Sequence, residues 1–500
     1  MGENSLPGEF DLLVQGTGFT ESIVAAAASR IGKTVLHIDS NEYYGGQWAS
    51  FNLEGFQKHL SESPNFQATQ NWNTDESETS EWTKENILKT SRRFSIDLTP
   101  KLLFSRGKLV KLLISSNICR YAEFRAADNV CTFEESTSSL KSVPCSRTDV
   151  FNSKDLTIIE KRLLMKLLNS FLNYKDEEVP EEFKNYLGKP FLEFLKFQRL
   201  TPKIINNVMN SISMCDEDAL LEEGIEKTKN FLLNLGFYGN TPFLFPMYGC
   251  GEIPQCFCRL CAVFGGVYCL KKPISKIEEK DDEISFTTDN QVIKAKKLVF
   301  GSSNIPEELL SSEKKTDHCC GGLSRGVFIL EKPLGSEELN SGGGGVNFLK
   351  LPGGNGGAFI LQLSHYSGTC PKGLHLVHIT SKSSSTPSDD LQPFVEKLFT
   401  DEHKPLYTAY FTLPSCSSKV STTENIVECC GTFFELDYDK SIENAEMVFK
   451  KLYPDEEFLP RAPDPEEIII ENEDPTAISE HTLPEDLKAQ LLLEESSKEV

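Results

Sequence analysis

The sequence predicts an α/β fold: a sheet domain of the dinucleotide-binding type, interrupted by an inserted all-helical block. Two stretches of the chain predict this arrangement. Residues 9–39 are patterned as strand, glycine turn, helix and strand, which is the βαβ unit of dinucleotide-binding proteins. Residues 146–237 carry apolar side chains at helical spacing, and segments with strand character flank them on both sides.

The βαβ unit begins with a short apolar strand at residues 12–14, of the kind that is covered on both faces of a sheet. Gly16 and Gly18 form a tight turn, and an alanine-rich helix follows them. A second strand then ends at Asp39, about twenty residues after the glycines. In dinucleotide-binding proteins, an acid at this position binds a ribose hydroxyl group.

One residue departs from the dinucleotide fingerprint, which is Gly-x-Gly-x-x-Gly. Its third glycine position holds Glu21, whose carboxylate would stand in the first turn of the helix that should receive a pyrophosphate. Two anions there would repel each other. We therefore interpret Gly16, Gly18, Glu21 and Asp39 as a vestigial nucleotide motif, and we expect no flavin or other cofactor. The alternative is that the two glycines are a strand–helix turn and nothing more.

Charge and composition narrow the classes of function. The formal net charge is −23, which argues against nucleic acid or an anionic membrane as the main partner, because both bind clustered lysine and arginine. Residues 455–500 hold 15 acidic and 3 basic side chains, or −12 of that charge, and we expect this tail to be disordered. The 15 cysteines lack regular spacing and indicate buried free thiols. Without a signal segment or a membrane-spanning run, the chain is expected to be cytosolic.

The remaining pattern predicts four regions. They are a first part of the sheet domain at residues 1–145, a helical domain at 146–237, a second part of the sheet domain at 238–454, and the acidic tail at 455–500. Strands that return to the sheet are expected at 121–133 and 140–144, a central strand at 297–301, and further strands at 374–379 and 407–411. Helices are expected at 101–115, 156–171, 191–200, 203–214, 225–235, 254–265 and 443–451, and a loop at 61–86.

Two glycine-rich stretches could form a binding surface. Tyr43 and Tyr44 precede two glycines, and this pattern fits either an exposed aromatic contact patch or an aromatic core pair at a turn. Glu252 and Arg259 lie at or near the helix predicted to start at Pro254, as a binding pair or as an ordinary solvated pair.

The cysteines at 256, 258 and 261 raise the question of a metal site. Positions two apart on a helix diverge by about 200°, and no histidine or fourth thiol lies near them in the sequence. We therefore predict no metal. The sequence also contains no recognisable catalytic motif.

Several of these segments, in the same order, carry a family resemblance. They are residues 10–21, Tyr43-Tyr44-Gly45-Gly46 and Tyr248-Gly249-x-Gly251-Glu252-x-Pro254-Gln255. Together they resemble the superfamily of GDP dissociation inhibitors and Rab escort proteins. Residues 144–154, 160–162 and 255–259 are similar to the escort proteins in particular. The resemblance is dense over residues 9–60 and 91–270 and thin beyond them.

The resemblance implies a fold and a role. The fold would be a flavoprotein-like (FAD/NAD-binding-type) sheet domain that lacks its cofactor and has a helical domain inserted. The role would be that of a non-catalytic escort in vesicle transport, which binds newly made Rab GTPases in their GDP form. It would present them to the Rab geranylgeranyltransferase α/β heterodimer, hold the geranylgeranyl lipid of the product, and deliver the product transiently to membranes.

The resemblance also implies residue roles. Tyr44, Glu252, Arg259 and Cys269 match the Rab-binding platform, although the dissociation inhibitors favour methionine at the position of Cys269. Phe151 and Arg162 match positions that contact the transferase, and eleven residues of one helix would bring them to one face after about three turns. The helical domain would supply the lipid site, for which the candidates are Leu164, Leu167, Leu168, Phe171, Phe194 and Leu195.

Two other functions stay open. A GDP dissociation inhibitor would recycle lipidated Rab from membranes and would lack the aromatic side chain at position 151. A flavin oxidoreductase would bind a flavin at the glycine turn.

Overall fold

The structure is a computed structural model of the 500-residue chain. It describes residues 6–63, 66–74, 81–135, 139–175, 177–280, 283–289, 291–301, 322–340, 345–414 and 423–461. Met1–Pro460 form one compact unit, and Arg461 is the one described residue of the other unit, Arg461–Val500. Of the tail expected at 455–500, residues 462–500 lie outside the described residues, whereas residues 455–461 are described and Leu459 is buried in the core.

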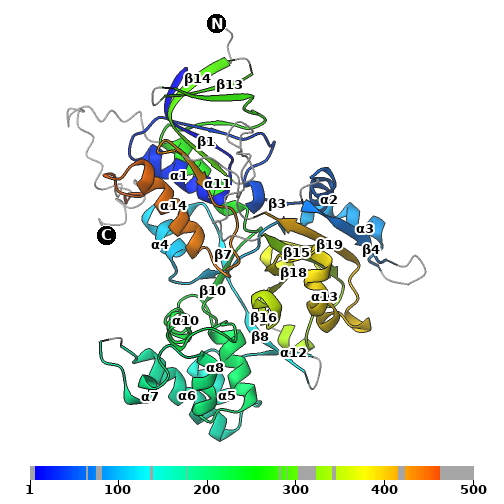
Figure 1. The fold of residues 1–500 in the computed structure, drawn as a ribbon. Coiled ribbons are helices and arrows are strands. Elements are labelled where there is room, and N and C mark those ends of the chain that lie inside the picture. Colours follow the sequence, from blue (N-terminus) through cyan, green and yellow to red (C-terminus); the bar gives the residue numbers. More distant parts are fainter. Residues whose placement is uncertain are drawn as a thin grey trace, which may run out of the picture. The chain divides into compact units, whose positions relative to one another are not determined.

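A seven-stranded sheet contains the predicted βαβ unit (Figure 1). Its central strand β1 (Glu9–Gln15) pairs in parallel with β2 (Val35–Ile38) and with β14 (Gln291–Gly301), which confirms the predicted central strand at 297–301. The other strands are β11 (Val267–Cys269), β12 (Lys276–Lys280), β13 (Glu283–Thr288) and β20 (Ile426–Cys429).

Helix α1 (Phe19–Arg30) packs on β1, β2 and β14, and residues 19–29 of it are all buried. Four consecutive alanines, at 25–28, have no exposed surface, and their small side chains let the helix approach the sheet closely. Helices α11 (Glu252–Val263) and α14 (Asp439–Leu452) flank α1. The helix expected at 254–265 begins two residues earlier, at Glu252, and the helix expected at 443–451 begins four residues earlier, at Asp439.

A second sheet of eight strands was not expected as a separate sheet. Its order is β4-β19-β15-β18-β17-β16-β8-β9, and only the β16–β8 pair is parallel. The bounds are β4 (Thr69–Trp72), β8 (Asn129–Glu134), β9 (Ser139–Ser142), β15 (Leu323–Leu330), β16 (Val346–Leu351), β17 (Ala358–Ser364), β18 (His375–Lys382) and β19 (Tyr407–Leu413). Helix α13 (Pro387–Leu398) covers β15, β18 and β19 (Figure 1).

Several expected boundaries were wrong. The strands expected at 121–133 and 140–144 do not return to the parallel sheet. The first part of this segment forms β7 (Phe124–Ala126), which belongs to a three-stranded sheet with β6 (Leu103–Phe104) and β10 (Phe243–Pro246). The rest forms β8 and β9, which belong to the eight-stranded sheet.

The helix expected from residue 101 begins only at Lys108, as α4 (Lys108–Ser115), because β6 takes the residues before it. The expected loop at 61–86 contains β4 and overlaps the end of α2 (Leu53–Glu62) and the start of α3 (Lys84–Lys89), and it is partly outside the described residues. Two short elements complete the strands and helices: a two-stranded pair of β3 (Ser50–Phe51) with β5 (Ile96–Asp97), and α12 (Glu337–Asn340).

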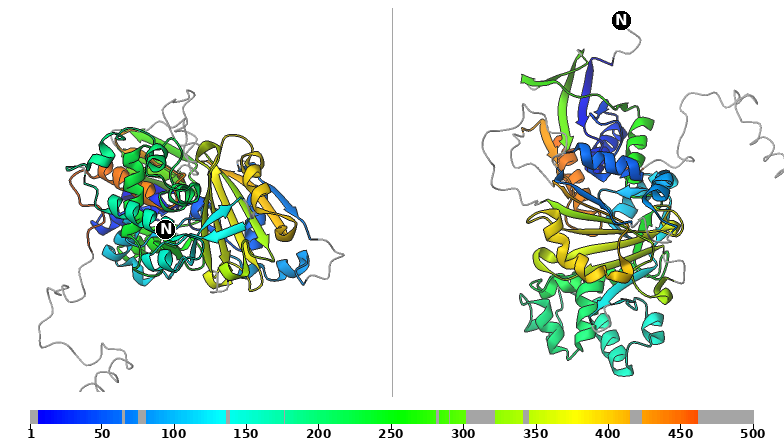
Figure 2. Two further views of the ribbon diagram at one scale, coloured as in Figure 1. Left: turned by 90° about the horizontal axis from the view of Figure 1, so that it is seen from below. Right: turned by 90° about the vertical axis from the view of Figure 1, so that its right-hand side faces the viewer.

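A block of helices follows β9 and ends before β10, as the sequence predicts (Figures 1 and 2). Thr157 caps α6 in a capping box with Glu160, again as predicted. The elements are α5 (Arg147–Asn152), α6 (Ile158–Leu172), α7 (Glu181–Lys184), α8 (Phe191–Phe197), α9 (Pro202–Asn206), a π-helix η5 (Asn207–Ile212) and α10 (Leu221–Leu233).

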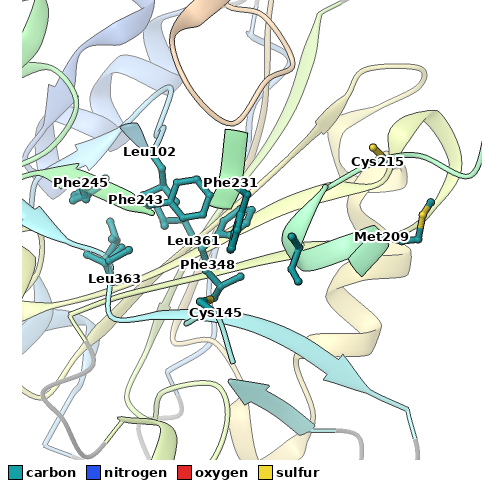
Figure 3. Packing of buried hydrophobic residues seen from close by; sticks show 14 of the residues in the cluster. Leu102, Cys145, Met209, Cys215, Phe231, Phe243, Phe245, Phe348, Leu361 and Leu363 are labelled. Atoms are coloured by element: carbon teal, nitrogen blue, oxygen red, sulfur yellow. The ribbon is translucent and has the colours of Figure 1, made fainter. Parts of the chain in front are cut away.

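The helical block shares its core with the sheets. Phe231 of α10 packs edge-on against Phe243 of β10, with ring centroids 5.9 Å apart, and Phe243 packs against Phe348 of β16 at 5.6 Å (Figure 3). The π-helix η5 lies on β8 and β16. The division into separate domains at residues 145 and 237 therefore stays a prediction.

The described cysteines are free thiols, and nine of them are buried, as predicted, whereas Cys119 is exposed. Within the described ranges, no three histidine, cysteine or acidic side chains gather in a way that could hold a metal ion. The same ranges contain no helix with the length and apolar character needed to cross a membrane.

Candidate functional site

A surface pocket of about 360 Å³ brings together three of the four residues assigned to the binding platform, Tyr44, Glu252 and Arg259. Helix α11 supplies most of the lining, and the loop after β2, the turn before β7 and the strand β11 supply one tyrosine each. The complete lining is Tyr44, Tyr121, Glu252, Gln255, Cys256, Cys258, Arg259, Ala262 and Tyr268.

Helix α11 presents Glu252 and Arg259 on its exposed side, because they are seven residues, or about two turns, apart. Its apolar side chains, such as Phe257, are buried against α1 and the core beneath it. The Cys250 N–H donates to Asp97 Oδ1 at 2.8 Å, and the Gly251 N–H donates to Ser50 Oγ at 2.8 Å. These bonds fix the entry of the helix and with it the position of Glu252.

Both charged side chains of the pocket are available to a partner. The Arg259 guanidinium lies 4.2 Å from the centroid of the Tyr121 ring, a cation–π contact that holds it in place. Neither Glu252 nor Arg259 forms an ion pair with another described residue. Partial burial raises the pKa of Glu252. A basic group from a partner would lower that pKa again and gain a charge-assisted bond.

The two tyrosines before Gly45 have different environments. Tyr43 packs inward against Phe51, with ring centroids 4.8 Å apart, and does not line the pocket. Tyr44 lines the pocket, and its ring centroid is 6.1 Å from that of Tyr268. Of the two alternatives expected for this pair, core packing thus applies to Tyr43 and an accessible contact applies to Tyr44.

Cys269, the fourth platform residue, lies outside the pocket lining. It pairs with Ile38 across β11 and β2, is half-buried, and packs against the apolar cluster on the other side of the sheet. Successive residues of a strand point to opposite faces, so Cys269 and Tyr268 cannot both face the pocket.

The glycine turn that would cradle a dinucleotide is filled by protein atoms. A Cβ atom built on Gly18 would lie 2.6 Å from Oε2 of Glu21, and the same carboxyl group fills the space beside Gly301. Asp39, expected to meet a ribose, accepts hydrogen bonds from the Thr17 N–H at 2.8 Å and the Thr17 hydroxyl at 2.7 Å. These residues do not fit a bound dinucleotide.

The pKa of Glu21 corrects the expectation that its negative charge would repel a pyrophosphate. Burial, and then the nearby Asp39 carboxylate, raise the pKa of Glu21 to about 8, against the effect of its own backbone N–H. At neutral pH the Glu21 side chain is therefore mostly protonated. It would exclude a pyrophosphate chiefly by filling the space, and much less by the charge repulsion that we expected.

The proposed transferase contact consists of side chains from two helices, not one. Phe151 belongs to α5 and Arg162 to α6, so the argument from one helix face was wrong. The Lys161 ammonium group donates to the Phe151 carbonyl oxygen at 2.7 Å and ties the two helices together. Phe151 is 72% exposed, Ile158 72% and Ile159 70%, and Arg162 is exposed as well.

The six lipid candidates are buried in the interior of the helical block. Phe171 and Phe194 pack with ring centroids 6.0 Å apart, and Phe183 stacks on Phe194 at 5.0 Å. A separate pocket of about 980 Å³ is lined by apolar side chains such as Leu192 and Met209 and also by charged ones such as Lys350.

Sequence reasoning missed Tyr121 and Tyr268, which complete the aromatic lining of the pocket. Tyr268 directly precedes Cys269, and the strand alternation would have distinguished the two positions. Tyr121 has no local signal, because it comes to the pocket only through the tertiary contact between its ring and Arg259.

The amino-acid sequence is similar to that of known proteins over most of its length. The sequence profile of the family described as GDI, GDP dissociation inhibitor, matches residues 6–411. The "Rab proteins geranylgeranyltransferase component A" of Drosophila melanogaster is 49% identical, with 98% of this chain and 97% of that protein covered. The human "Rab proteins geranylgeranyltransferase component A 1" is 33% identical, with 96% and 97% covered.

Solved structures share the fold. The crystal structure of the Rab GDI from Plasmodium falciparum has a TM-score of 0.67 at 20% identity, with 90% of this chain and 99% of that chain covered. An oxidoreductase from Methanosarcina mazei has a TM-score of 0.54 at 13% identity, with 88% and 100% covered. These likenesses confirm the predicted flavoprotein-like α/β fold class. By the match of its sequence over most of its length, the chain belongs to the GDP dissociation inhibitor family.

Proposed function

We propose that this protein is a non-catalytic Rab escort protein. It binds Rab GTPases in their GDP form, presents them to Rab geranylgeranyltransferase, and keeps the prenylated product until a membrane receives it. The names of the fly and human relatives support this proposal, since both are components of a Rab geranylgeranyltransferase and align over nearly the whole chain. A relative from Arabidopsis thaliana, 27% identical over 93% of this chain and 96% of that protein, is named Rab escort protein 1.

The observation that carries the proposal is the pocket with unpaired Glu252 and Arg259 beside Tyr44. Tyrosine and arginine, together with tryptophan, are enriched among the side chains that contribute most of the binding energy in protein interfaces. An acid and a base about two helical turns apart select a partner with the opposite charges at matching positions, and they orient it during the encounter. Cys269, on the other face of β11, would act on this surface through the backbone of its strand.

The proposed transferase contact is an apolar patch that the exposed side chains of Phe151, Ile158 and Ile159 would form, with Arg162 at its side. Three apolar side chains with 70% or more of their surface exposed are costly for a protein without a partner. Covering them would remove apolar area from water, and the arginine could pair with a carboxylate at the rim.

The helical block is the proposed lipid site. Each methylene of a geranylgeranyl chain costs about 0.8 kcal/mol in water, so an apolar interior without any catalytic group can hold the product. The six candidate side chains are tightly packed, and a lipid would have to displace them, for example by separating α6 from α8.

A recycling dissociation inhibitor is the second candidate. A "Probable secretory pathway GDP dissociation inhibitor 1" of Schizosaccharomyces pombe is 29% identical, with 78% of this chain and 84% of that protein covered. The exposed Phe151 favours the escort function, because a recycling inhibitor needs no transferase contact.

Reconstituted prenylation separates the two candidates. The full chain is mixed with purified Rab geranylgeranyltransferase, geranylgeranyl pyrophosphate and an unprenylated Rab loaded with GDP, and lipid incorporation is measured. An escort protein makes the incorporation depend on its own concentration. If the Rab is modified no faster with the chain than without it, the escort function is refuted and the recycling function is preferred.

An absorbance spectrum tests the absence of a cofactor. The filled space around Glu21 predicts a colourless purified protein. Absorbance in the flavin bands, lost on denaturation and gel filtration, would contradict the proposal and favour an oxidoreductase.

A further inference from the structure

Tyr268 links the binding pocket to the interior of the sheet. It stands in β11 at the register position of His37 in β2, so both side chains lie on the same face of the parallel sheet. The Tyr268 hydroxyl is 2.6 Å from His37 Nδ1, and the two ring centroids are 4.6 Å apart. On its other side, the Tyr268 ring faces the pocket next to Tyr44.

The hydrogen bonds of His37 have a single consistent arrangement. His37 Nε2 lies 2.5 Å from the carbonyl oxygen of Gly16, which can only accept, so Nε2 carries the proton. Burial lowers the pKa of His37 to about 4, so the ring is neutral near pH 7 and Nδ1 is an acceptor. The Tyr268 hydroxyl must therefore donate to Nδ1, and the Tyr268 ring is fixed to the glycine turn through His37.

A second set of hydrogen bonds leads from the same turn to Tyr44. The Gly45 N–H donates to the Thr17 carbonyl oxygen at 3.1 Å and to the Thr17 hydroxyl oxygen at 3.0 Å. The Thr17 hydroxyl in turn donates to Asp39. Gly16 and Thr17, adjacent in the chain, thus hold Tyr268 and Tyr44, two of the three tyrosines of the pocket, by separate routes.

We propose that Tyr268 is a contact residue for the Rab GTPase and that His37 is the positioning residue that orients it. This inference rests on the proposed function and adds a residue to the binding surface. It also gives the glycine turn a present role: the backbone that would bind phosphates in a dinucleotide-binding protein supports the aromatic side chains of a protein-binding pocket.

The test measures the affinity of the full chain for a purified, unprenylated Rab loaded with GDP. Tyr268→Ala should weaken binding about tenfold or more, as expected for a tyrosine at the centre of an interface. Tyr268→Phe keeps the ring and frees it from His37, and should weaken binding about threefold. Tyr410→Phe, at a half-buried tyrosine of β19 far from the pocket lining, is the matched control and should bind as the wild type does.

The positioning role of His37 requires a double-mutant cycle. His37→Phe should weaken binding about threefold in the wild-type background and should have no further effect in the Tyr268→Ala background, because it acts only through that ring. Melting temperatures establish that each variant is folded. A His37→Phe effect of the same size in both backgrounds would overturn the positioning role.

The Rab affinities of the variants show whether this inference alone is wrong or the binding surface as a whole. If Glu252→Ala and Tyr44→Ala weaken Rab binding while both Tyr268 variants leave it unchanged, Tyr268 is not a contact and the proposed function stands. If none of these variants changes binding, the pocket is not the Rab site, and both this inference and the assignment of the pocket as the Rab-binding surface fail; the escort function itself is decided by the prenylation assay. Should Tyr268→Ala not fold, Tyr268→Phe decides the question.

Discussion

The carboxyl group of Glu21 packs directly on Gly18, where an added Cβ atom would stand 2.6 Å from Oε2. It also fills the space beside Gly301, at the point where β14 ends next to β1. In a dinucleotide-binding protein, the pyrophosphate lies at this place, between the glycine turn and the helix N-terminus. The residue that breaks the glycine fingerprint thus occupies the space that the fingerprint keeps open.

The buried Glu21 makes stability depend on pH. Its pKa of about 8 in the folded protein, against an ordinary 4.5, means that the folded state binds this proton more tightly than the unfolded chain does. The wild type should therefore lose stability as the pH rises from about 4.5 to about 8. Glu21→Gln lacks this loss and should be more stable than the wild type above pH 8, by on the order of 4 kcal/mol.

Urea unfolding at pH 5 and at pH 8.5 measures this difference. Glu226→Gln, at an exposed position in α10, is the matched control and should change the unfolding free energy little at either pH. A stability advantage of Glu21→Gln that is the same at both pH values would refute the buried titration of Glu21.

The close packing around Glu21 also predicts a compensating pair of substitutions. A Cβ atom at Gly301 would overlap the Glu21 carboxyl group, so Gly301→Ala should destabilise the protein by about 1–3 kcal/mol. Truncating the side chain in Glu21→Ala removes the clash. Gly301→Ala should then cost much less in the Glu21→Ala background, as measured by thermal or urea unfolding. Equal costs in the two backgrounds would show that the side chain lies elsewhere.

The βαβ unit could be predicted from the sequence because its signals are local. A buried apolar strand, two glycines and an acid at a fixed spacing lie within residues 9–39. The eight-stranded sheet could not be predicted, since its pairs join distant segments, such as Phe348 with Val130 and Tyr407 with Trp72. Alternating apolar residues predict a strand but carry no information about its neighbour.

The error at Phe151 and Arg162 has a different cause. Thr157 with Glu160 was correctly predicted to cap a helix, and an N-cap residue marks a new start with non-helical backbone angles. One helix could not therefore run from residue 151 to residue 162, and the capping pattern of Thr157 and Glu160 already excluded it. The two helices nevertheless contact each other, and Lys161 of α6 donates a hydrogen bond to the carbonyl oxygen of Phe151 in α5.

A larger side chain in the helical block should oppose lipid binding. Leu168 is buried beside Phe171 in the candidate lipid site, and Leu168→Phe would fill space that a geranylgeranyl chain needs. We expect the affinity for a geranylgeranylated Rab to fall about tenfold, while the affinity for unprenylated, GDP-loaded Rab stays the same. Leu391→Phe, equally buried under the eight-stranded sheet, controls for overpacking. A similar loss of lipid affinity in both variants would contradict the assignment.

Truncating the exposed ring of Phe151 should separate two binding activities. Because Phe151 is 72% exposed and contributes little to the core, Phe151→Ala should leave the melting temperature unchanged. It should weaken binding of purified Rab geranylgeranyltransferase tenfold or more, by about the amount seen for aromatic hot spots, without changing the affinity for GDP-loaded Rab. Phe197→Ala removes another exposed ring, 55% exposed, from α8 in the same block and should bind the transferase normally. Normal transferase binding by Phe151→Ala would exclude this patch as the contact.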